Sequence, residues 1–366
     1  MSAGRRTKKK KHTARSVVLL IILLFVAFAL GSYLNYSLSI STPLQPDKKI
    51  YRSIEIKSGD PTSTIAKKLK KAKIIRSARA FTIYARVHSL DSSFQAGTYA
   101  LSPSQSITEI VDTIVNGKVN VVSVTIPEGF TEYEIADRLA DMGVVNRDVF
   151  IKKLESKDYS DMYPFLKNAQ KGAHRLEGYL FPSTYAIPEN ATADQIIESM
   201  LDKYDTVFTS QYKRRAKELG YTENQIIIIA SIIEKEAASD QDRKKIASVI
   251  YNRLDAGMRL QMDSTVQYVL GLKKSRKKDL TISDTKLKSE YNTYKKKGLP
   301  YGPICCPGKK SIEAALYPAK TDYLYFILSD KLDGTMNFSK SYKKFLKDKK
   351  AYYDARDKAE KNSNGS

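Results

Sequence analysis

The sequence predicts an α+β protein that is attached to a membrane by a single N-terminal helix. Three observations support this class: an uncharged apolar segment near the N-terminus, strand and helix patterns that alternate along the chain, and an isoleucine-rich stretch typical of a buried helix. The chain has 366 residues, 42% of them hydrophobic, which is enough for two or three domains with their own cores.

The chain is strongly basic, with 62 lysines and arginines, 40 acidic residues and a net charge of +22. This charge fits an anionic partner such as nucleic acid, lipid headgroups or an acidic cell-wall polymer, although a generally lysine-rich composition would produce the same figure. The two cysteines, Cys305 and Cys306, are neighbours and are poorly placed to bridge each other. No disulfide framework is therefore expected.

Residues 17–40 are predicted to form a transmembrane anchor. The first eighteen of them carry no charge, which is close to the lower limit for a helix that spans a bilayer. The early basic cluster lies in residues 1–16, so the positive-inside rule places this basic tail in the cytoplasm and the rest of the chain outside the cell membrane. That location argues against nucleic acid as the partner.

A cleaved signal peptide is the alternative for this segment, because residues 27–29 read Ala-Phe-Ala, the small-x-small form of a cleavage site. The tripeptide is embedded in apolar sequence and lacks a polar flank. We therefore prefer a single-pass anchor that is retained.

An internal repeat with a spacing of seventy residues follows the anchor. Each copy predicts a short strand, a glycine turn, an amphipathic helix and a second helix that begins near Ser77 or Asn146. The first copy continues into a strand over residues 94–101 and a helix over residues 107–115. The matching residues are Ile56, Gly59, Ile65, Ala66, Leu69, Ile74 and Ile75 in the first copy, and Ile126, Gly129, Ile135, Ala136, Leu139, Val144 and Val145 in the second.

This strand-helix-helix-strand unit resembles LysM, a small module that binds glycans containing N-acetylglucosamine. We expect a LysM-like subdomain over residues 50–120 and a second LysM-like repeat or connector over residues 121–160. A structural α+β lobe that binds nothing is an equally compatible interpretation.

The largest domain is expected over residues 161–345. Its predicted elements are helices over 193–219, 224–238 and 241–256, a loop-rich stretch to about residue 310, and a strand over 323–328. The lysine-rich end that begins at residue 341 is typical of a solvated helix that frays, so residues 346–366 are expected to form a polar C-terminal tail.

Carboxylates are the best candidates for chemistry in this chain. Its three histidines, His12, His88 and His174, lie in unrelated places, which argues against a histidine metal cluster. Glu234 and Glu236 lie on the isoleucine-rich helix, whose composition indicates burial. The helical neighbours of Glu234 are alanines and a serine, which leaves space for a substrate, whereas Glu236 has two isoleucines and a second acid beside it.

Neither glutamate has a lysine or arginine three or four residues away, so no surface ion pair is expected. Partial burial without a cation raises the pKa of a carboxyl and lets it donate a proton near neutral pH. These features make Glu234 the candidate catalytic acid. A buried glutamate that is hydrogen-bonded to the backbone is the alternative.

Four groups of sequence motifs stand in a fixed order within about residues 50–345. They are LEGYLFPSTY at 176–185, ASIIEKE at 230–236, VIYNRL at 249–254 with MRLQMDSTVQY at 258–268, and YNTY at 291–294 followed by GLP, GPI and Pro307-Gly308. Together they resemble the MltG (YceG-like) endolytic murein transglycosylase family. Cys306 and Met336 depart from the pattern, because many members carry Asn and His there.

The resemblance implies that residues 161–345 form a catalytic transglycosylase domain and that Glu234, the first glutamate of its motif, is the catalytic residue. It implies non-hydrolytic cleavage of the β-1,4 bond between N-acetylmuramic acid and N-acetylglucosamine. The acid protonates the leaving oxygen and then, as carboxylate, draws the proton from the C6 hydroxyl that closes on C1, which leaves a 1,6-anhydro end. Neither a cofactor nor a metal is implied.

Polar residues in the same motifs are candidates for substrate binding, because amide, guanidinium and carboxylate groups hydrogen-bond sugars and tyrosine rings stack on them. For Glu177 a loop-ordering role is preferred, for the tyrosines simple packing is the commoner role, and for Asn252, Arg253, Gln261 and Asp263 a structural role is equally compatible. The candidates are Asn252, Arg253, Gln261, Asp263, Tyr291, Asn292, Tyr294 and Glu177.

The expected partners are peptidoglycan strands, the membrane and peptidoglycan synthases of the elongation or division machinery. By resemblance, the enzyme would act on nascent strands and terminate their elongation.

Two alternative functions differ from this one in their products. A membrane-anchored peptidoglycan-binding scaffold would create no new ends, and a hydrolytic muramidase would create reducing ends.

Overall fold

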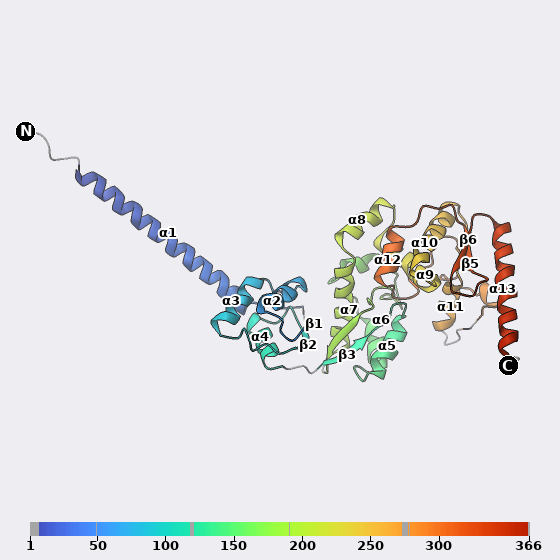
Figure 1. Ribbon diagram of the computed structural model, residues 1–366, viewed down its shortest axis with the longest axis horizontal. Helices are drawn as coiled ribbons and strands as arrows, with labels where there is room; N and C mark the ends of the chain where they lie inside the picture. The colour runs from blue at the N-terminus through green and yellow to red at the C-terminus, as the bar shows by residue number, and fades with distance from the viewer. Residues whose placement is uncertain are drawn as a thin grey trace, which may run out of the picture. The chain divides into compact units, whose positions relative to one another are not determined.

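The computed structural model describes residues 7–48, 50–117, 121–189, 191–272, 277 and 279–364. Helices and two-stranded sheets alternate along these residues, which confirms the predicted α+β class (Figure 1). The chain divides into two compact units, one formed by residues 1–121 with 186–188 and the other by residues 122–185 with 189–366.

Helix α1 (Thr7–Ser41) contains a segment that is long and apolar enough to cross a membrane. That segment runs from Val17 to Ser41, and its apolar eighteen-residue window has no residue buried within the protein. Its large side chains are exposed, including Phe28 at 74% and Leu23 at 67%. Such an unpartnered apolar surface is compatible with the predicted single-pass anchor.

The first unit is built around an antiparallel pair of strands in which Ile54 faces Tyr99. Three helices cover the pair, and α1 adds Tyr36 and Ile40 to the core that they form. Helix α1 therefore joins this unit through packed side chains at its C-terminal end. The elements that follow α1 are β1 (Arg52–Ile56), α2 (Thr62–Lys71), α3 (Ala78–Val87), β2 (Gly97–Leu101) and α4 (Ile107–Val115).

The strand-helix-helix pattern occurs twice, as the sequence repeat predicts. The second copy consists of β3 (Val121–Thr125), α5 (Glu132–Asp141) and α6 (Arg147–Ser156). Gly59 and Gly129 both adopt a φ of +80°, so the two turns have the same left-handed geometry. Ser77 and Asn146 cap the second helix of each copy, as expected. The likeness of either copy to LysM stays a prediction.

Helix α9 forms the centre of the larger unit. Its residues 226–233 are all buried, and α8, α10, α11, α12 and the 3₁₀ helix η1 pack around it. The remaining elements are η1 (Pro164–Asn168), β4 (Thr184–Pro188), α7 (Ala193–Val207), α8 (Ser210–Glu218), α9 (Glu223–Glu236), α10 (Asp240–Asp255), α11 (Asp263–Leu272), η2 (Asp284–Lys286), α12 (Lys309–Leu316), β5 (Tyr325–Leu328), β6 (Met336–Ser339) and α13 (Tyr342–Asn364). β3 pairs with β4, and β5 pairs with β6.

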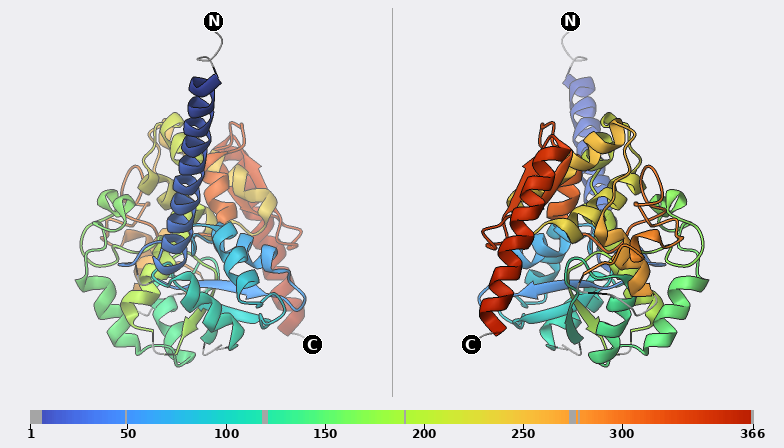
Figure 2. Two further views of the ribbon diagram at one scale, coloured as in Figure 1. Left: turned by 90° about the vertical axis from the view of Figure 1, so that its left-hand side faces the viewer. Right: turned by 90° about the vertical axis from the view of Figure 1, so that its right-hand side faces the viewer.

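Two predictions of secondary structure were wrong in part, and a third, the helix at the lysine-rich end, was confirmed but is longer than expected. The helix expected over 193–219 is two helices, because Thr209 accepts a hydrogen bond from the backbone N–H of Tyr212 and starts α8. The stretch expected to be rich in loops contains α11. The lysine-rich end forms one long helix, α13, which packs along β5 and β6, so the boundary at residue 345 falls inside it (Figure 2).

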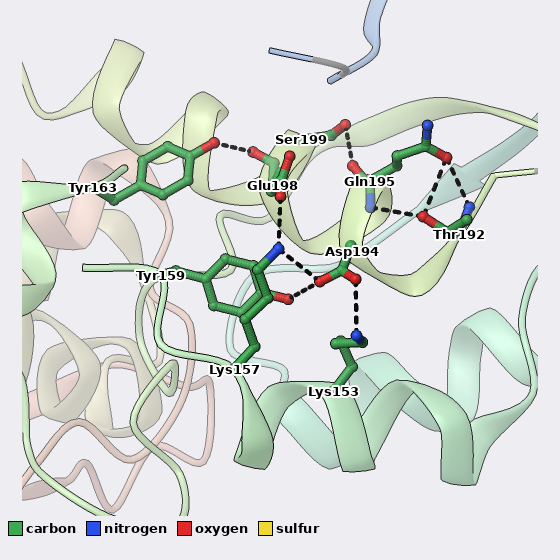
Figure 3. Close-up of polar contacts among 9 residues, drawn as sticks. All are labelled: Lys153, Lys157, Tyr159, Tyr163, Thr192, Asp194, Gln195, Glu198 and Ser199. Atoms are coloured by element: carbon green, nitrogen blue, oxygen red, sulfur yellow. Dashed lines mark hydrogen bonds and ion pairs between the residues drawn. The ribbon is translucent and has the colours of Figure 1, made fainter. Parts of the chain in front are cut away.

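A cluster of charged side chains fastens α6 and the residues after it to α7 (Figure 3). Asp194, in the first turn of α7, accepts from Lys153 at 2.9 Å, Lys157 at 3.0 Å and the Tyr159 hydroxyl at 2.8 Å. Lys157 also pairs with Glu198 at 3.1 Å. The second copy of the repeat is thereby held against the helices of the larger unit.

We predict that Gly178→Ala lowers the free energy of unfolding by about 2–4 kcal/mol. Gly178 has a φ of +89°, and an added Cβ would lie 2.6 Å from the Cβ of Pro303. Gly172→Ala is the matched control, because Gly172 has a φ of +83° but open space around it. Denaturant unfolding followed by the circular dichroism of the tyrosines should show a distinctly smaller loss for the control. Equal losses would contradict the packing argument.

Candidate active site

The C-terminal turn of α9 carries the two glutamates that the sequence singles out. The helix begins with a capping box between Thr222 and Gln225 and ends at Glu236, after which Ala237 adopts an extended conformation. Residues two positions apart on a helix point to different sides. Glu234 and Glu236 consequently lie in different surroundings.

Glu234 has a hydrogen-bond donor on each carboxylate oxygen. Arg243 donates to Oε1 at 3.1 Å, and the backbone N–H of Gly308 donates to Oε2 at 3.0 Å. The Glu234 side chain is only 7% exposed. The expectation that Glu234 has no basic partner was therefore wrong, because Arg243 comes from the following helix, α10.

Glu128 is a third carboxyl at this place, and the sequence interpretation missed it. A Cβ on Gly308 would overlap the Glu128 carboxyl, so both acids lie against the same glycine. Burial and the charge of Glu234 raise the pKa of Glu128, although Arg243 opposes the rise. A comparison of the two copies of the repeat could have pointed to Glu128, because the matching residue of the first copy, Ser58, carries no charge.

Glu236 has the properties expected of a proton donor. Its carboxyl accepts from the backbone N–H of Ser264 at 3.2 Å and has no ion-pair partner within the part of the chain that the structure describes. Burial raises the pKa of Glu236, the hydrogen bonds from Ser264 oppose the rise, and Asp263 adds to it. Glu236 also lines two cavities, one of about 330 Å³ and one of about 630 Å³.

The 630 Å³ cavity brings several predicted binding residues together with Glu236. Arg253, Gln261, Asp263 and Tyr294 all line it, and aromatic side chains from β5 and α13 form another wall. Tyr294 donates its hydroxyl hydrogen bond to Asp263. Aromatic rings beside planar polar groups suit the faces and hydroxyl groups of sugars.

Three predicted binding residues instead donate hydrogen bonds to backbone carbonyls. Asn252 donates to the carbonyls of Thr321 and Tyr323 at 2.8 and 2.9 Å. Arg253 donates to the carbonyls of Leu260 and Leu324, both at 2.6 Å. Asn292 is fully buried and donates to the carbonyls of Thr285 and Leu287 at 3.0 and 2.8 Å. Arg253 combines this structural role with a place on the cavity wall.

Glu177 lies in a separate buried cluster. It is 0% exposed and accepts from the hydroxyl of Tyr268 at 3.2 Å and from the backbone N–H of Glu132 at 3.3 Å. Tyr291 packs on the ring of Tyr268, with 4.9 Å between centroids. Glu132 in turn is paired with Nδ1 of His174, a partner that the sequence did not reveal. Such contacts fit the loop-ordering role preferred for Glu177.

Taken together, fold and site define an α+β protein with an apolar N-terminal helix and an acid at the end of a buried helix, beside an aromatic-lined cavity. Residues 54–351 match the model of the YceG-like family, and the chain belongs to this family. The predicted family is thus confirmed.

Relatives with similar sequences are named endolytic murein transglycosylases. The protein of Bacillus subtilis (strain 168) is 37% identical over 336 residues, which cover 88% of this chain and 91% of the relative. The protein of Streptococcus pneumoniae serotype 2 (strain D39) is 31% identical over 353 residues, which cover 90% of this chain and 63% of the relative. A crystal structure of a yceG-like protein from Listeria monocytogenes has a TM-score of 0.57 at 37% identity and covers 81% of this chain and 98% of its own.

We predict that Glu177→Gln makes the stability less dependent on pH. Burial raises the pKa of Glu177 well above its usual value, and Glu132 adds to the rise. The stability gained from the protonated form is complete below the unfolded-state pKa and is lost as pH rises through the folded-state pKa. Glutamine cannot ionise, so the variant should gain stability relative to wild type as pH rises from about 5.

The check is denaturant unfolding of both proteins between about pH 4 and pH 9. The two curves of unfolding free energy against pH should separate as the pH rises. His174 contributes a pH dependence to both proteins: burial lowers its pKa, but the hydrogen bond and the charge of Glu132 together outweigh burial and raise it. A constant difference at every pH would contradict the buried-acid assignment.

Proposed function

We propose that this chain is a peptidoglycan lytic transglycosylase that cuts glycan strands internally. The names of its relatives support this activity, and so does the aromatic-lined cavity beside the end of α9. The observation that carries the proposal is Glu236, a carboxyl with a raised pKa and no basic partner among the described residues, on the wall of that cavity. Raised carboxyl pKa values are typical of general acids that work near neutral pH.

The reaction needs a single carboxyl because the substrate supplies its own nucleophile. The protonated acid gives its proton to the glycosidic oxygen as the bond from that oxygen to C1 of N-acetylmuramic acid breaks. The resulting carboxylate takes the proton from the C6 hydroxyl while O6 bonds to C1. The products are a 1,6-anhydro end and a strand that begins with N-acetylglucosamine, and the carboxyl is protonated again.

The geometry favours Glu236 over Glu234 as the proton donor. Both oxygens of Glu234 are occupied by donors from Arg243 and Gly308, whereas Glu236 faces the cavities. Glu234 would then hold α10 and the loop before α12 in place. The assignment of Glu234, implied by family resemblance, stays a prediction, and two matched variants separate the roles.

We expect Glu236→Gln to lower the rate of anhydro-end formation by at least about 100-fold, the usual contribution of a general acid. Glu234→Gln should lower it by about tenfold, through loss of positioning. The assay incubates the full chain in detergent with purified glycan strands and counts anhydro ends by mass spectrometry. The reverse order of losses would restore Glu234 as the acid.

The same assay separates the alternative functions. Strand binding without new ends in the wild-type chain would favour the non-catalytic scaffold, and reducing ends would indicate a hydrolase. Circular dichroism and strand binding of both variants control for folding.

A second prediction concerns the pH profile of kcat/KM. A general acid works only while protonated, so activity should fall as pH rises through the raised pKa of Glu236. Asp263→Asn removes a negative charge that adds to this rise, so the falling limb should move to lower pH. Asp322→Asn is the control, because Asp322 pairs with Lys340 and lines neither cavity beside Glu236. If the falling limb of the Asp263→Asn profile stays at the wild-type pH, the result counts against Glu236 as the general acid.

The cellular setting follows from the anchor. Helix α1 would hold the chain in the cell membrane with its basic N-terminus in the cytoplasm, and the catalytic unit would lie outside. The packing of Tyr36 and Ile40 on the first unit keeps that unit next to the membrane surface. This supports action on nascent strands during elongation, beside the peptidoglycan synthases.

A further inference from the structure

We propose that the cavity between α5, α6 and α11 binds saccharide units of the same glycan strand at a distance from the cut. This inference rests on the proposed function and assigns a second binding site. The cavity has a volume of about 600 Å³, and its lining includes Tyr133, Asp137, Arg147, Ile151 and Tyr268. None of these residues belongs to the cavities beside Glu236 except Tyr268.

The lining has the chemistry of a sugar site. Tyr133 and Tyr268 supply aromatic surface, and the guanidinium of Arg147 lies 5.9 Å from the centre of the Tyr133 ring. Arg147 is paired with Asp137, and both side chains are partly exposed, at 37% and 54%. A paired carboxylate and guanidinium present donors and acceptors that match sugar hydroxyl and acetamido groups.

The charge of the lining favours a neutral ligand. Glu134 and Asp137 contribute two acidic groups, and Arg147 contributes one basic group. The balance of one negative charge disfavours an anionic ligand such as the carboxylates of stem peptides. N-acetylglucosamine carries no charge to be repelled, and N-acetylmuramic acid is neutral while its lactyl carboxyl is bound in an amide.

The three cavities adjoin one another through shared residues. Tyr268 lines both the 600 Å³ cavity and the 330 Å³ cavity. The 330 Å³ cavity shares Lys235, Glu236 and Asp263 with the 630 Å³ cavity. Glu236 thus has binding space on two sides, as an enzyme that cuts inside a strand requires.

Binding energy from the remote site would be used in catalysis. Contacts far from the reacting bond hold the substrate in register and raise kcat/KM for substrates long enough to reach them. The proposal therefore predicts a dependence on strand length that disappears when the 600 Å³ cavity is filled.

The test uses Ile151→Trp, which places an indole in the cavity, and Val149→Trp as the matched control. Val149 lies on the same helix, is 53% exposed and is outside the lining. The full chain in detergent is assayed with long and short glycan strands from which an amidase has removed the stem peptides and whose freed lactyl carboxylates have been converted to neutral methylamides. Ile151→Trp should lower kcat/KM about tenfold on long strands, equivalent to about 1.4 kcal/mol, and less than about twofold on the shortest strands cleaved. The control should match wild type on both.

Other outcomes would overturn the proposal. Equal losses on long and short strands, or no loss on long strands, would mean that the cavity takes no part in strand binding. A loss seen only with strands that keep their stem peptides would assign the cavity to peptide. If Ile151→Trp does not fold, Arg147→Ala removes a polar contact at little cost in stability, because its ion pairs are at the surface. The same dependence on strand length is then expected for Arg147→Ala.

A binding experiment separates this inference from the proposed activity. Calorimetric titration of the stem-free strands compares two proteins that lack both candidate acids through Glu234→Gln and Glu236→Gln, one with Ile151 and one with Ile151→Trp as a third change, and so measures the site without cleavage. Weaker binding by the triple variant supports the cavity even if wild type produces no anhydro ends. Equal binding by the two variants overturns the cavity even if wild type is active.

Discussion

The burial of helix α9 is the constraint on which the candidate active site depends. Every side chain from residue 226 to residue 233 is buried, and most of them are isoleucines. Each buried isoleucine contributes roughly 1.5–3 kcal/mol, so the helix cannot turn or slide without a large loss of stability. The packing of α8, α10, α11 and α12 around it fixes its C-terminal turn. Acid-base chemistry requires this fixed position, because a proton transfers only over hydrogen-bond distances.

The same turn gives two acids different environments. Glu234 points to Arg243 and Gly308, which satisfy both of its oxygens, and Glu236 points to the cavities, where burial raises its pKa. One acid contributes to the packing of neighbouring elements, and the other is available to a ligand. The environment decides the difference, because the two side chains are chemically identical.

The repeated strand-helix-helix pattern serves two purposes in the protein. The first copy packs against the C-terminal end of helix α1 through Tyr36 and Ile40. The second copy is fastened to α7 by the charges around Asp194, and its loop carries Glu128 to Gly308. The buried positions at the end of the strand and in the first helix correspond in the two copies, namely Ile56, Ile65, Ala66 and Leu69 with Ile126, Ile135, Ala136 and Leu139, whereas the residues at position 58 of the first copy and 128 of the second differ. Shared packing therefore preserves the fold while the loop positions acquire separate roles.

The sequence by itself determined the features that depend on neighbouring residues. These are the apolar N-terminal helix, the repeat with its caps at Ser77 and Asn146, and the buried character of α9. The apolar spacing of Val266, Val269 and Leu270 is also typical of a helix, so α11 could have been predicted from the sequence. Only the tertiary structure decided that Arg243 pairs with Glu234 and that Glu236 faces the cavities. It also decided that Asn252 and Asn292 donate hydrogen bonds to backbone carbonyls. Those contacts join residues from different elements, and the periodicity within one helix does not specify which side chains a neighbouring element will bring to it.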